Sequence, residues 1–204
     1  MKQYGFFIDS SKCTGCKTCQ LACKDFKNYG VEQNFRRVYE YTGGSWTEDK
    51  GTYRQDVFAY YTSIACNHCD EPACVKVCPS GAMHKREDGF VIVAEDVCIG
   101  CGQCANACPY RAPQYNAEKG HMTKCDGCYE RVAEGLQPVC VGSCPLRALE
   151  FGPIDELREK YGTNADVAPL PPSSITKPNI VIKLNGNARP TGDTSGSIAN
   201  PREV

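Results

Sequence analysis

Residues 98–109 read CIGCGQCANACP, and this stretch decides the fold. Its four cysteines have the spacing C-x2-C-x2-C-x3-C and are followed by Pro109. The first three lie within one short loop and point their sulfurs inward, as thiolates that wrap an iron–sulfur cluster do. The stretch therefore predicts a cluster site with the backbone folded around it.

The pattern occurs four times along the sequence, so all sixteen cysteines fall into four groups of four. Residues 13–23 repeat the spacing, whereas residues 66–78 and 125–144 lengthen the middle gap but keep the C-x3-C-P ending. The groups are Cys13, Cys16, Cys19 and Cys23; Cys66, Cys69, Cys74 and Cys78; Cys98, Cys101, Cys104 and Cys108; and Cys125, Cys128, Cys140 and Cys144. Sixteen thiolates at these spacings predict four [4Fe–4S] clusters that relay single electrons.

Two other uses of cysteine fit the pattern less well. Disulfides usually join distant segments with a suitable Cα separation, not cysteines of one tight triplet. Structural zinc takes four ligands, usually from two well-separated C-x2-C knuckles, and has no use for the third cysteine of each triplet. Iron–sulfur ligation is therefore the preferred interpretation, with a zinc-built scaffold protein as the alternative in a different functional class.

In two-cluster ferredoxins, the fourth cysteine of each run ligates the cluster of the other run. We apply this rule to the two inner groups by their spacing, and to the two outer groups by symmetry. Site 1 is then Cys13, Cys16, Cys19 and Cys144; site 2 is Cys125, Cys128, Cys140 and Cys23; site 3 is Cys66, Cys69, Cys74 and Cys108; and site 4 is Cys98, Cys101, Cys104 and Cys78.

Charge and hydropathy limit the classes of partner and the cellular compartment that we expect for the protein. The formal net charge of −1 treats every cysteine as neutral. Each oxidised site would add about −2, so the loaded protein would carry roughly −9, which many of the 23 lysines and arginines are expected to offset. The near-zero net charge of the sequence gives no indication of nucleic-acid binding. The longest apolar run, residues 90–94, is far shorter than the ~20 residues of a membrane span, and residues 1–8 lack secretory features. We expect folding and cluster insertion in the cytoplasm.

The segments between the cysteines predict an α+β fold. Residues 4–9 and 148–151 are strand-like and are expected to pair, and residues 35–41 and 53–64 predict a hairpin whose aromatic residues cover the core. Residues 129–134 and 154–161 predict helices, each ended by glycine. The architecture is two nested ferredoxin-like units, each with two [4Fe–4S] clusters, with a β-hairpin insertion and an extended C-terminal tail. The boundaries are 1–26 with 110–164 for the outer unit, 27–64 for the hairpin, 65–109 for the inner unit and 165–204 for the tail.

The tail and the histidines complete the residue-level predictions. Proline, glycine and polar residues dominate from residue 165, which fits either a disordered tail or one that wraps a partner. We prefer the second, because residues 180–182 (IVI) offer a strand to a partner's sheet edge. His68 is not needed as a ligand beside sixteen cysteines, although it can donate a hydrogen bond near a cluster. His84 and His121 are expected to be ordinary surface or loop residues.

The sequence resembles the iron–sulfur electron-transfer subunits, or B subunits, of anaerobic dimethyl sulfoxide reductases. The stretches that carry the resemblance are YGFFIDSSKCTGCKTCQLACKD (4–25), CNHCDEPACVKVCPSGAMHKREDGF (66–90), DVCIGCGQCANACPY (96–110), GHMTKCDGCYERVAEG (120–135) and CPLRALEFGPIDELR (144–158), with KPNIVIK (177–183) and RPTGDTSG (189–196) in the tail. In related nitrate reductase subunits, tryptophan replaces one cysteine of the third group. Here Cys101 holds that position, which implies four [4Fe–4S] clusters.

The resemblance also implies partners. A membrane-anchor subunit would oxidise menaquinol, and a molybdopterin catalytic subunit would reduce dimethyl sulfoxide or a related S- or N-oxide. Site 4 would face the anchor and site 1 the molybdenum subunit, so electrons would pass through sites 4, 3, 2 and 1. The protein itself would have no catalytic residue and would lie peripherally on the bacterial cytoplasmic membrane within the complex. The alternative in this class is the electron subunit of another molybdenum or tungsten oxidoreductase, such as a formate dehydrogenase.

Overall fold

The computed structural model describes residues 3–204, so the first two residues of the predicted outer unit lie outside the described residues. The strands are β1 (Tyr4–Asp9), β2 (Arg37–Gly43), β3 (Trp46–Asp49), β4 (Thr52–Gln55), β5 (Phe58–Ile64), β6 (Met83–Lys85), β7 (Val91–Val93), β8 (Gln114–Asn116), β9 (His121–Thr123), β10 (Leu149–Pro153), β11 (Ile180–Lys183) and β12 (Gly196–Ile198). The helices are α1 (Thr18–Phe26), α2 (Ala73–Lys76), α3 (Gln103–Ala107), α4 (Tyr129–Ala133), α5 (Val139–Gly142), α6 (Ile154–Tyr161) and the 3-10 turn Ser173–Ile175. The predicted α+β class is confirmed.

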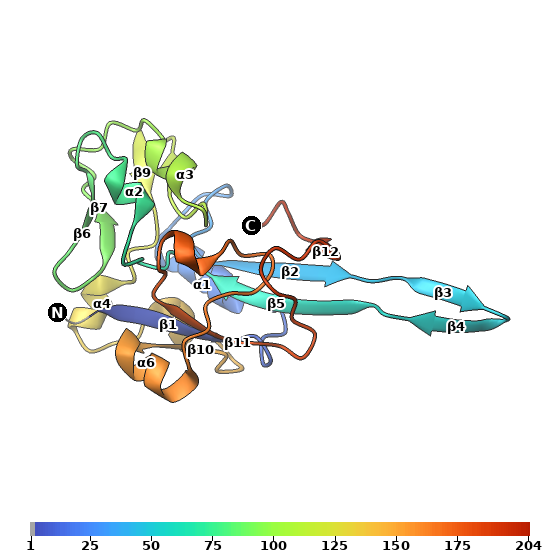
Figure 1. Ribbon diagram of the computed structural model, residues 1–204. Helices are drawn as coiled ribbons and strands as arrows, with labels where there is room; N and C mark the ends of the chain where they lie inside the picture. The colour runs from blue at the N-terminus through green and yellow to red at the C-terminus, as the bar shows by residue number, and fades with distance from the viewer. Residues whose placement is uncertain (1–2) are drawn as a thin grey trace.

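A three-stranded sheet in the order β10-β1-β11 forms the base of the body (Figure 1). β1 pairs antiparallel with β10, with Phe6 opposite Phe151, which confirms the predicted pairing. Successive side chains of β1 point to opposite faces of the sheet, so the strand packs against a separate layer on each face. Ile8 packs into the main core, while Phe7 stacks on Tyr161 of α6 with ring centroids 3.7 Å apart. Burial on both faces is what a central strand requires.

The C-terminal segment packs on the protein's own core. β11 pairs in parallel with β1, with Val181 opposite Phe7, and Ile180, Val181 and Ile182 are at most 2% exposed. The prediction that residues 180–182 extend a partner's sheet is therefore wrong, because β1 already uses the strand. Burial of Val167 extends this packing to the start of the predicted tail. Whether the remaining surface of residues 165–204 contacts a partner stays a prediction.

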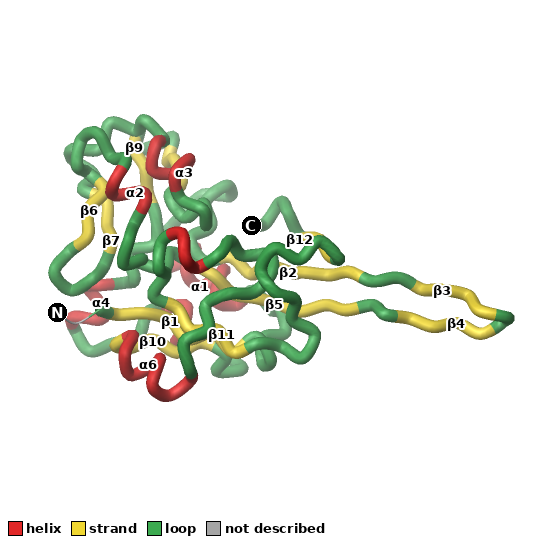
Figure 2. The backbone as a smooth tube through the Cα atoms, in the orientation of Figure 1, coloured by secondary structure: helices red, strands yellow, loops and turns green. Residues whose placement is uncertain are grey.

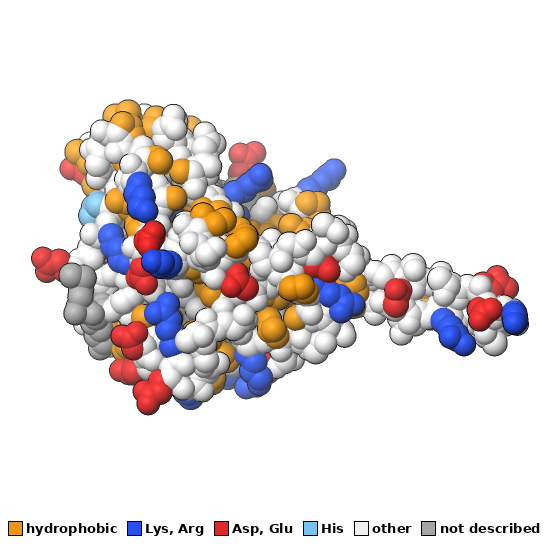
Figure 3. Space-filling model, viewed as in Figure 1, with side chains coloured by type: hydrophobic (Ala, Val, Ile, Leu, Met, Phe, Trp, Pro, Cys, Tyr) orange, Lys and Arg blue, Asp and Glu red, His pale blue; other side chains and the backbone are white. Residues whose placement is uncertain are grey.

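A long two-stranded ribbon projects from the body, as Figures 1 and 2 show. β2 pairs with β5 from Arg37 to Gly43, and β3 pairs with β4 at the far end. Near the body the aromatic residues cover the core as predicted, since Tyr41 and Tyr60 are buried, and β12 adds a third strand there. At the far end Trp46 is 67% exposed. Acidic and basic side chains surround the tip (Figure 3).

A smaller lobe above the base contains α2, α3 and the short hairpins β6–β7 and β8–β9 (Figure 1). Its small core consists of Cys74, Met83, Val91, Cys104 and Met122, so two cysteines occupy positions that larger apolar side chains usually fill. His121, expected at the surface, is buried on β9 with its Nε2 3.2 Å from the Glu95 carboxylate; that expectation is wrong.

Candidate iron–sulfur sites

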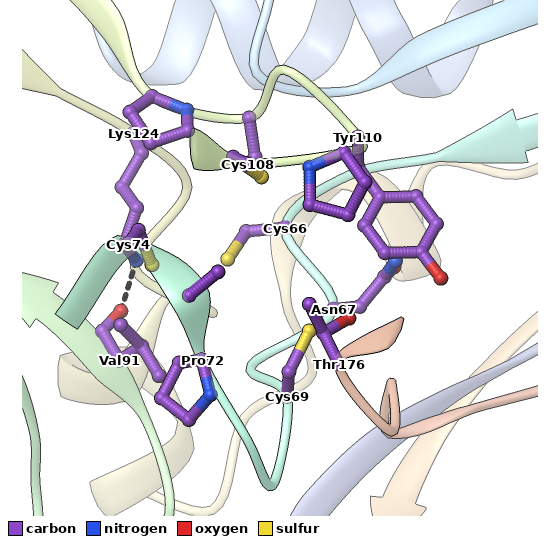
Figure 4. A pocket seen from close by; sticks show the side chains of 14 residues that line it. Cys66, Asn67, Cys69, Pro72, Cys74, Val91, Cys108, Tyr110, Lys124 and Thr176 are labelled. Atoms are coloured by element: carbon purple, nitrogen blue, oxygen red, sulfur yellow. Dashed lines mark hydrogen bonds between the residues drawn. The ribbon is translucent and has the colours of Figure 1, made fainter. Parts of the chain in front are cut away.

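The four cysteines assigned to site 3 line one pocket, shown in Figure 4. Cys66 and Cys69 follow β5, Cys74 lies in α2, and Cys108 ends α3. The whole pocket, which other residues also line, has an empty volume of about 370 Å3, part of it open to solvent. The pocket therefore takes three cysteines from one sequence group and the fourth from the next.

Sites 1 and 4 have the same arrangement. A second pocket of about 370 Å3 is lined by Cys13, Cys16, Cys19 and Cys144. A third, of about 290 Å3, is lined by Cys78, Cys98, Cys101 and Cys104. Among residues 3–204, no three His, Cys, Asp or Glu side chains converge as the ligands of a single metal ion would. The sulfurs instead line the walls of the pockets.

Site 2 lies deepest, because all four of its cysteines are buried. Burial raises the pKa of Cys23 to about 12, and the charges of Cys140 and Cys128 add to the rise. Burial likewise raises the pKa of Cys125 well above its usual value, with Cys23 the next contributor. These mutual effects show that the four thiols are electrostatic neighbours.

Short helices carry cysteines of neighbouring predicted sites. On α1, Cys19 and Cys23 are one turn apart on the same face; Cys19 lines the site 1 pocket, and Cys23 lies near Cys140 of site 2. α1 packs on α5, which carries Cys140 and is followed by Cys144. The contacting helices α2 and α3 relate sites 3 and 4 in the same way.

Burial makes most of the thiols hard to ionise. It raises the pKa of Cys13 to about 11 and those of Cys69 and Cys74 to about 12. Iron is bound by the thiolate, so binding must drive deprotonation, and cluster insertion should release protons. At Cys16, hydrogen bonds from Thr18 are the largest influence and lower the pKa.

Main-chain N–H groups point at several of the sulfurs. Met83 N donates to Cys78 Sγ at 3.3 Å and Met122 N to Cys98 Sγ at 3.4 Å. Ala148 N donates to Cys144 Sγ at 3.3 Å. Such donors stabilise negative charge on sulfur and tune the potential of a bound cluster.

The donor set fits [4Fe–4S] clusters. In the described part of the structure, the Asn67 Nδ2 beside the site 3 cysteines is buried without a hydrogen-bond partner. His68 Nδ1 accepts a hydrogen bond from Val91 N at 3.0 Å, so the neutral ring carries its proton on the buried Nε2. Burial is the main reason that the pKa of His68 is lowered, so the ring stays neutral. Buried donors beside four thiols suit a bound group rich in sulfur and negative charge.

Three buried cations near the sites were not identified from the sequence. They are Arg36, Arg37 and Lys124, each at most 5% exposed. Lys124 Nζ donates to the carbonyls of Val91 and Cys125 and lies at the site 3 pocket (Figure 4). For the two arginines, the sequence feature that could have indicated burial is their position inside the apolar, strand-like stretch FRRV, residues 35–38.

Comparisons with known proteins agree with this geometry. The family model of a 4Fe-4S dicluster domain matches residues 57–154, and that of a 4Fe-4S binding domain matches residues 4–25. No helix over residues 3–204 has the length and apolar character to cross a membrane.

Three relatives match almost end to end. The probable anaerobic dimethyl sulfoxide reductase chain YnfG of Escherichia coli is 77% identical, and the B subunit of the anaerobic dimethyl sulfoxide reductase of the same species is 73% identical; each alignment covers 99% of this protein and 98% of the relative. The B subunit from Haemophilus influenzae is 67% identical over the full length of both proteins. The protein therefore belongs to the family of anaerobic dimethyl sulfoxide reductase B subunits, the iron–sulfur electron-transfer subunits.

Proposed function

We propose that the protein carries four [4Fe–4S] clusters at sites 1 to 4, with the ligand sets expected from the sequence. The main support is that each predicted set of four lines one pocket at sites 1, 3 and 4, and that each cysteine of the site 2 set is buried. Bound clusters supply reversible one-electron chemistry; the protein supplies ligands, spacing, burial and hydrogen bonds.

The order of the sites supports a linear relay. α2 joins sites 4 and 3, the charge of Cys66 in site 3 raises the pKa of Cys125 in site 2, and α1 joins sites 2 and 1. Only Cys16 of site 1 and Cys101 of site 4 are exposed among the sixteen cysteines. Each end of the series therefore has one exposed cysteine.

We propose that electrons enter at site 4 from a quinol-oxidising membrane-anchor subunit. They would leave at site 1 to a molybdopterin subunit that reduces dimethyl sulfoxide or a related S- or N-oxide. Ile99 at the site 4 pocket is 67% exposed, an apolar side chain that an anchor could cover at this end. The protein would then lie peripherally on the cytoplasmic membrane as part of the complex.

We also propose that the cluster-binding body is two nested units, with residues 65–109 inside the unit formed by 1–26 and 110–164. The pairing of β1 with β10 supports this, because it joins the two ends of the outer unit. The ribbon of residues 27–64 would be an insertion between the outer and inner units.

Two matched variants of the intact complex test the direction of transfer. With a quinol analogue as donor, Cys101→Ser should slow reduction of all the other sites, as followed by rapid-freeze EPR. Cys16→Ser should leave reduction of sites 4, 3 and 2 unchanged but slow oxidation by the catalytic subunit and its substrate. The opposite pattern of effects in the two variants would show that electrons enter at site 1 and leave at site 4. Normal kinetics in both variants would refute the proposed relay.

A further inference from the structure

Arg36 is a buried cation with no carboxylate partner in the described part of the structure. Its side chain is 1% exposed. Nη1 donates to the Ser63 carbonyl at 3.1 Å and to Ser63 Oγ at 3.3 Å, whereas Nε and Nη2 have no acceptor among the described residues. An isolated charge is costly to bury, so an anion is expected next to it.

The groups around Arg36 come from two neighbouring sites. Ser63 Oγ, which Arg36 holds, lies 3.3 Å from Cys19 Sγ of site 1. Cys23 of site 2 lies one turn further along α1 from Cys19. On another side the guanidinium carbon lies 4.6 Å from the centroid of the Phe6 ring, which excludes water. The cation is therefore placed between sites 1 and 2 in a dry setting.

Electrostatics give the same placement. Burial raises the pKa of Cys19, and the Arg36 charge is the largest opposing influence. Desolvation disfavours the charged form of Arg36, but the charges of Cys140 and Cys19 outweigh it, so its pKa is raised and it stays protonated. One positive charge thus acts on cysteines of both sites.

The neighbouring Arg37 serves another site. It begins β2, and successive side chains of an extended strand point in opposite directions. Its Nη2 donates to the Tyr110 carbonyl at 2.6 Å, and its charge lowers the pKa of Cys108 in site 3, which burial raises. Arg37 is therefore a matched control: same residue type, same burial, different site.

We propose that Arg36 raises the reduction potentials of sites 1 and 2 together. The inference rests on the proposed ligand sets of these two sites. Reduction of either site adds one electron, taken from the preceding site, and so increases the negative charge next to the guanidinium. The buried cation stabilises that added charge, since local charge and hydrogen bonds set cluster potentials. Both centres at the exit end are thereby made better acceptors by a single residue.

The test is an EPR-monitored redox titration of the complete complex carrying Arg36→Gln. Components belonging to sites 1 and 2 are identified with Cys16→Ser and Cys128→Ser. We expect two of the four potentials to fall together, each with at least a tenfold loss of reduced cluster at fixed potential, equivalent to about 59 mV for one electron. Arg37→Gln should lower the site 3 potential and leave those of sites 1 and 2 unchanged.

Unchanged potentials in a fully loaded Arg36→Gln complex, or a fall at only one of the two sites, would overturn the proposal. If this variant does not assemble, Arg36→Met decides. It removes the charge but keeps a long unbranched side chain, so the same two potentials should fall, and unchanged values in a fully loaded complex would refute the role. Assignment of Cys16 and Cys128 to a single cluster would instead refute the ligand sets themselves.

Discussion

Replacing Ile182 with alanine should destabilise the whole protein, because this residue fastens the C-terminal segment to the cluster-binding body. Ile182 is 2% exposed, lies opposite Ile8 of β1, and belongs to the core that contains Cys19 and Cys144. Truncating a fully buried isoleucine removes its transfer free energy and leaves a cavity, at a cost of about 2–5 kcal/mol.

That loss can be measured as a shift in melting temperature. For a protein of this size each kcal/mol corresponds to about 2–4 °C, so Ile182→Ala should melt roughly 4–20 °C below the parent. Cluster loss makes unfolding irreversible, so apparent midpoints are compared under anaerobic conditions at one scan rate, by visible absorption and far-UV circular dichroism.

The control is Leu184→Ala, just beyond the end of β11. Leu184 is 47% exposed, and its truncation removes a similar apolar group from a surface position, so the midpoint should stay within the scatter of the parent. Equal midpoints for Ile182→Ala and Leu184→Ala would show that β11 does not pack against β1 in solution, and the account of the C-terminal segment would be wrong.

Three further outcomes follow from the same structure. Removing residues 165–204 should prevent stable cluster binding, measured as iron retained on purification, because the deletion uncovers β1; wild-type retention would contradict this. Asn179→Ala should perturb the EPR signal of site 3 more than the other signals, since Asn179 Nδ2 donates to the His68 carbonyl at 2.8 Å within the loop that carries Cys66 and Cys69. Cys101→Ser should convert site 4 to a three-iron centre or change its potential, and an unaltered oxidised EPR spectrum and redox titration would show that Cys101 is not a ligand.

The sequence was most informative where chemistry and periodicity act locally. Cysteine spacing predicted the groups because each loop positions its own three sulfurs. Apolar residues and a following glycine predicted α6, and continuous apolar character predicted β1. Such features depend on neighbours within a few residues, so one segment is enough to recognise them.

Long-range pairing was harder to predict. Residues 180–182 were recognised as a strand, but their own sequence does not say which sheet edge they meet. The missing clue lay in β1, whose residues 5–9 are all buried, as in a central strand that needs a neighbour on each side. Because β10 pairs with one edge of β1, the strand of residues 180–182 could have been assigned to the other edge.

The buried cations were missed for a related reason. Arginine is rarely fully buried, so Arg36 at the start of a strand favours an exposed position on local grounds. Cysteines far along the sequence, including Cys125 and Cys140, lie beside it and, as thiolate ligands, would supply the negative charge that its burial requires. Only the assembled structure brings these groups together.

The most direct test of the account is the iron and acid-labile sulfide content of anaerobically purified protein. Sixteen cysteines in four sites predict about sixteen iron and about sixteen sulfide per polypeptide. A content near eight of each, or stoichiometric zinc in place of iron, would contradict the four-cluster relay.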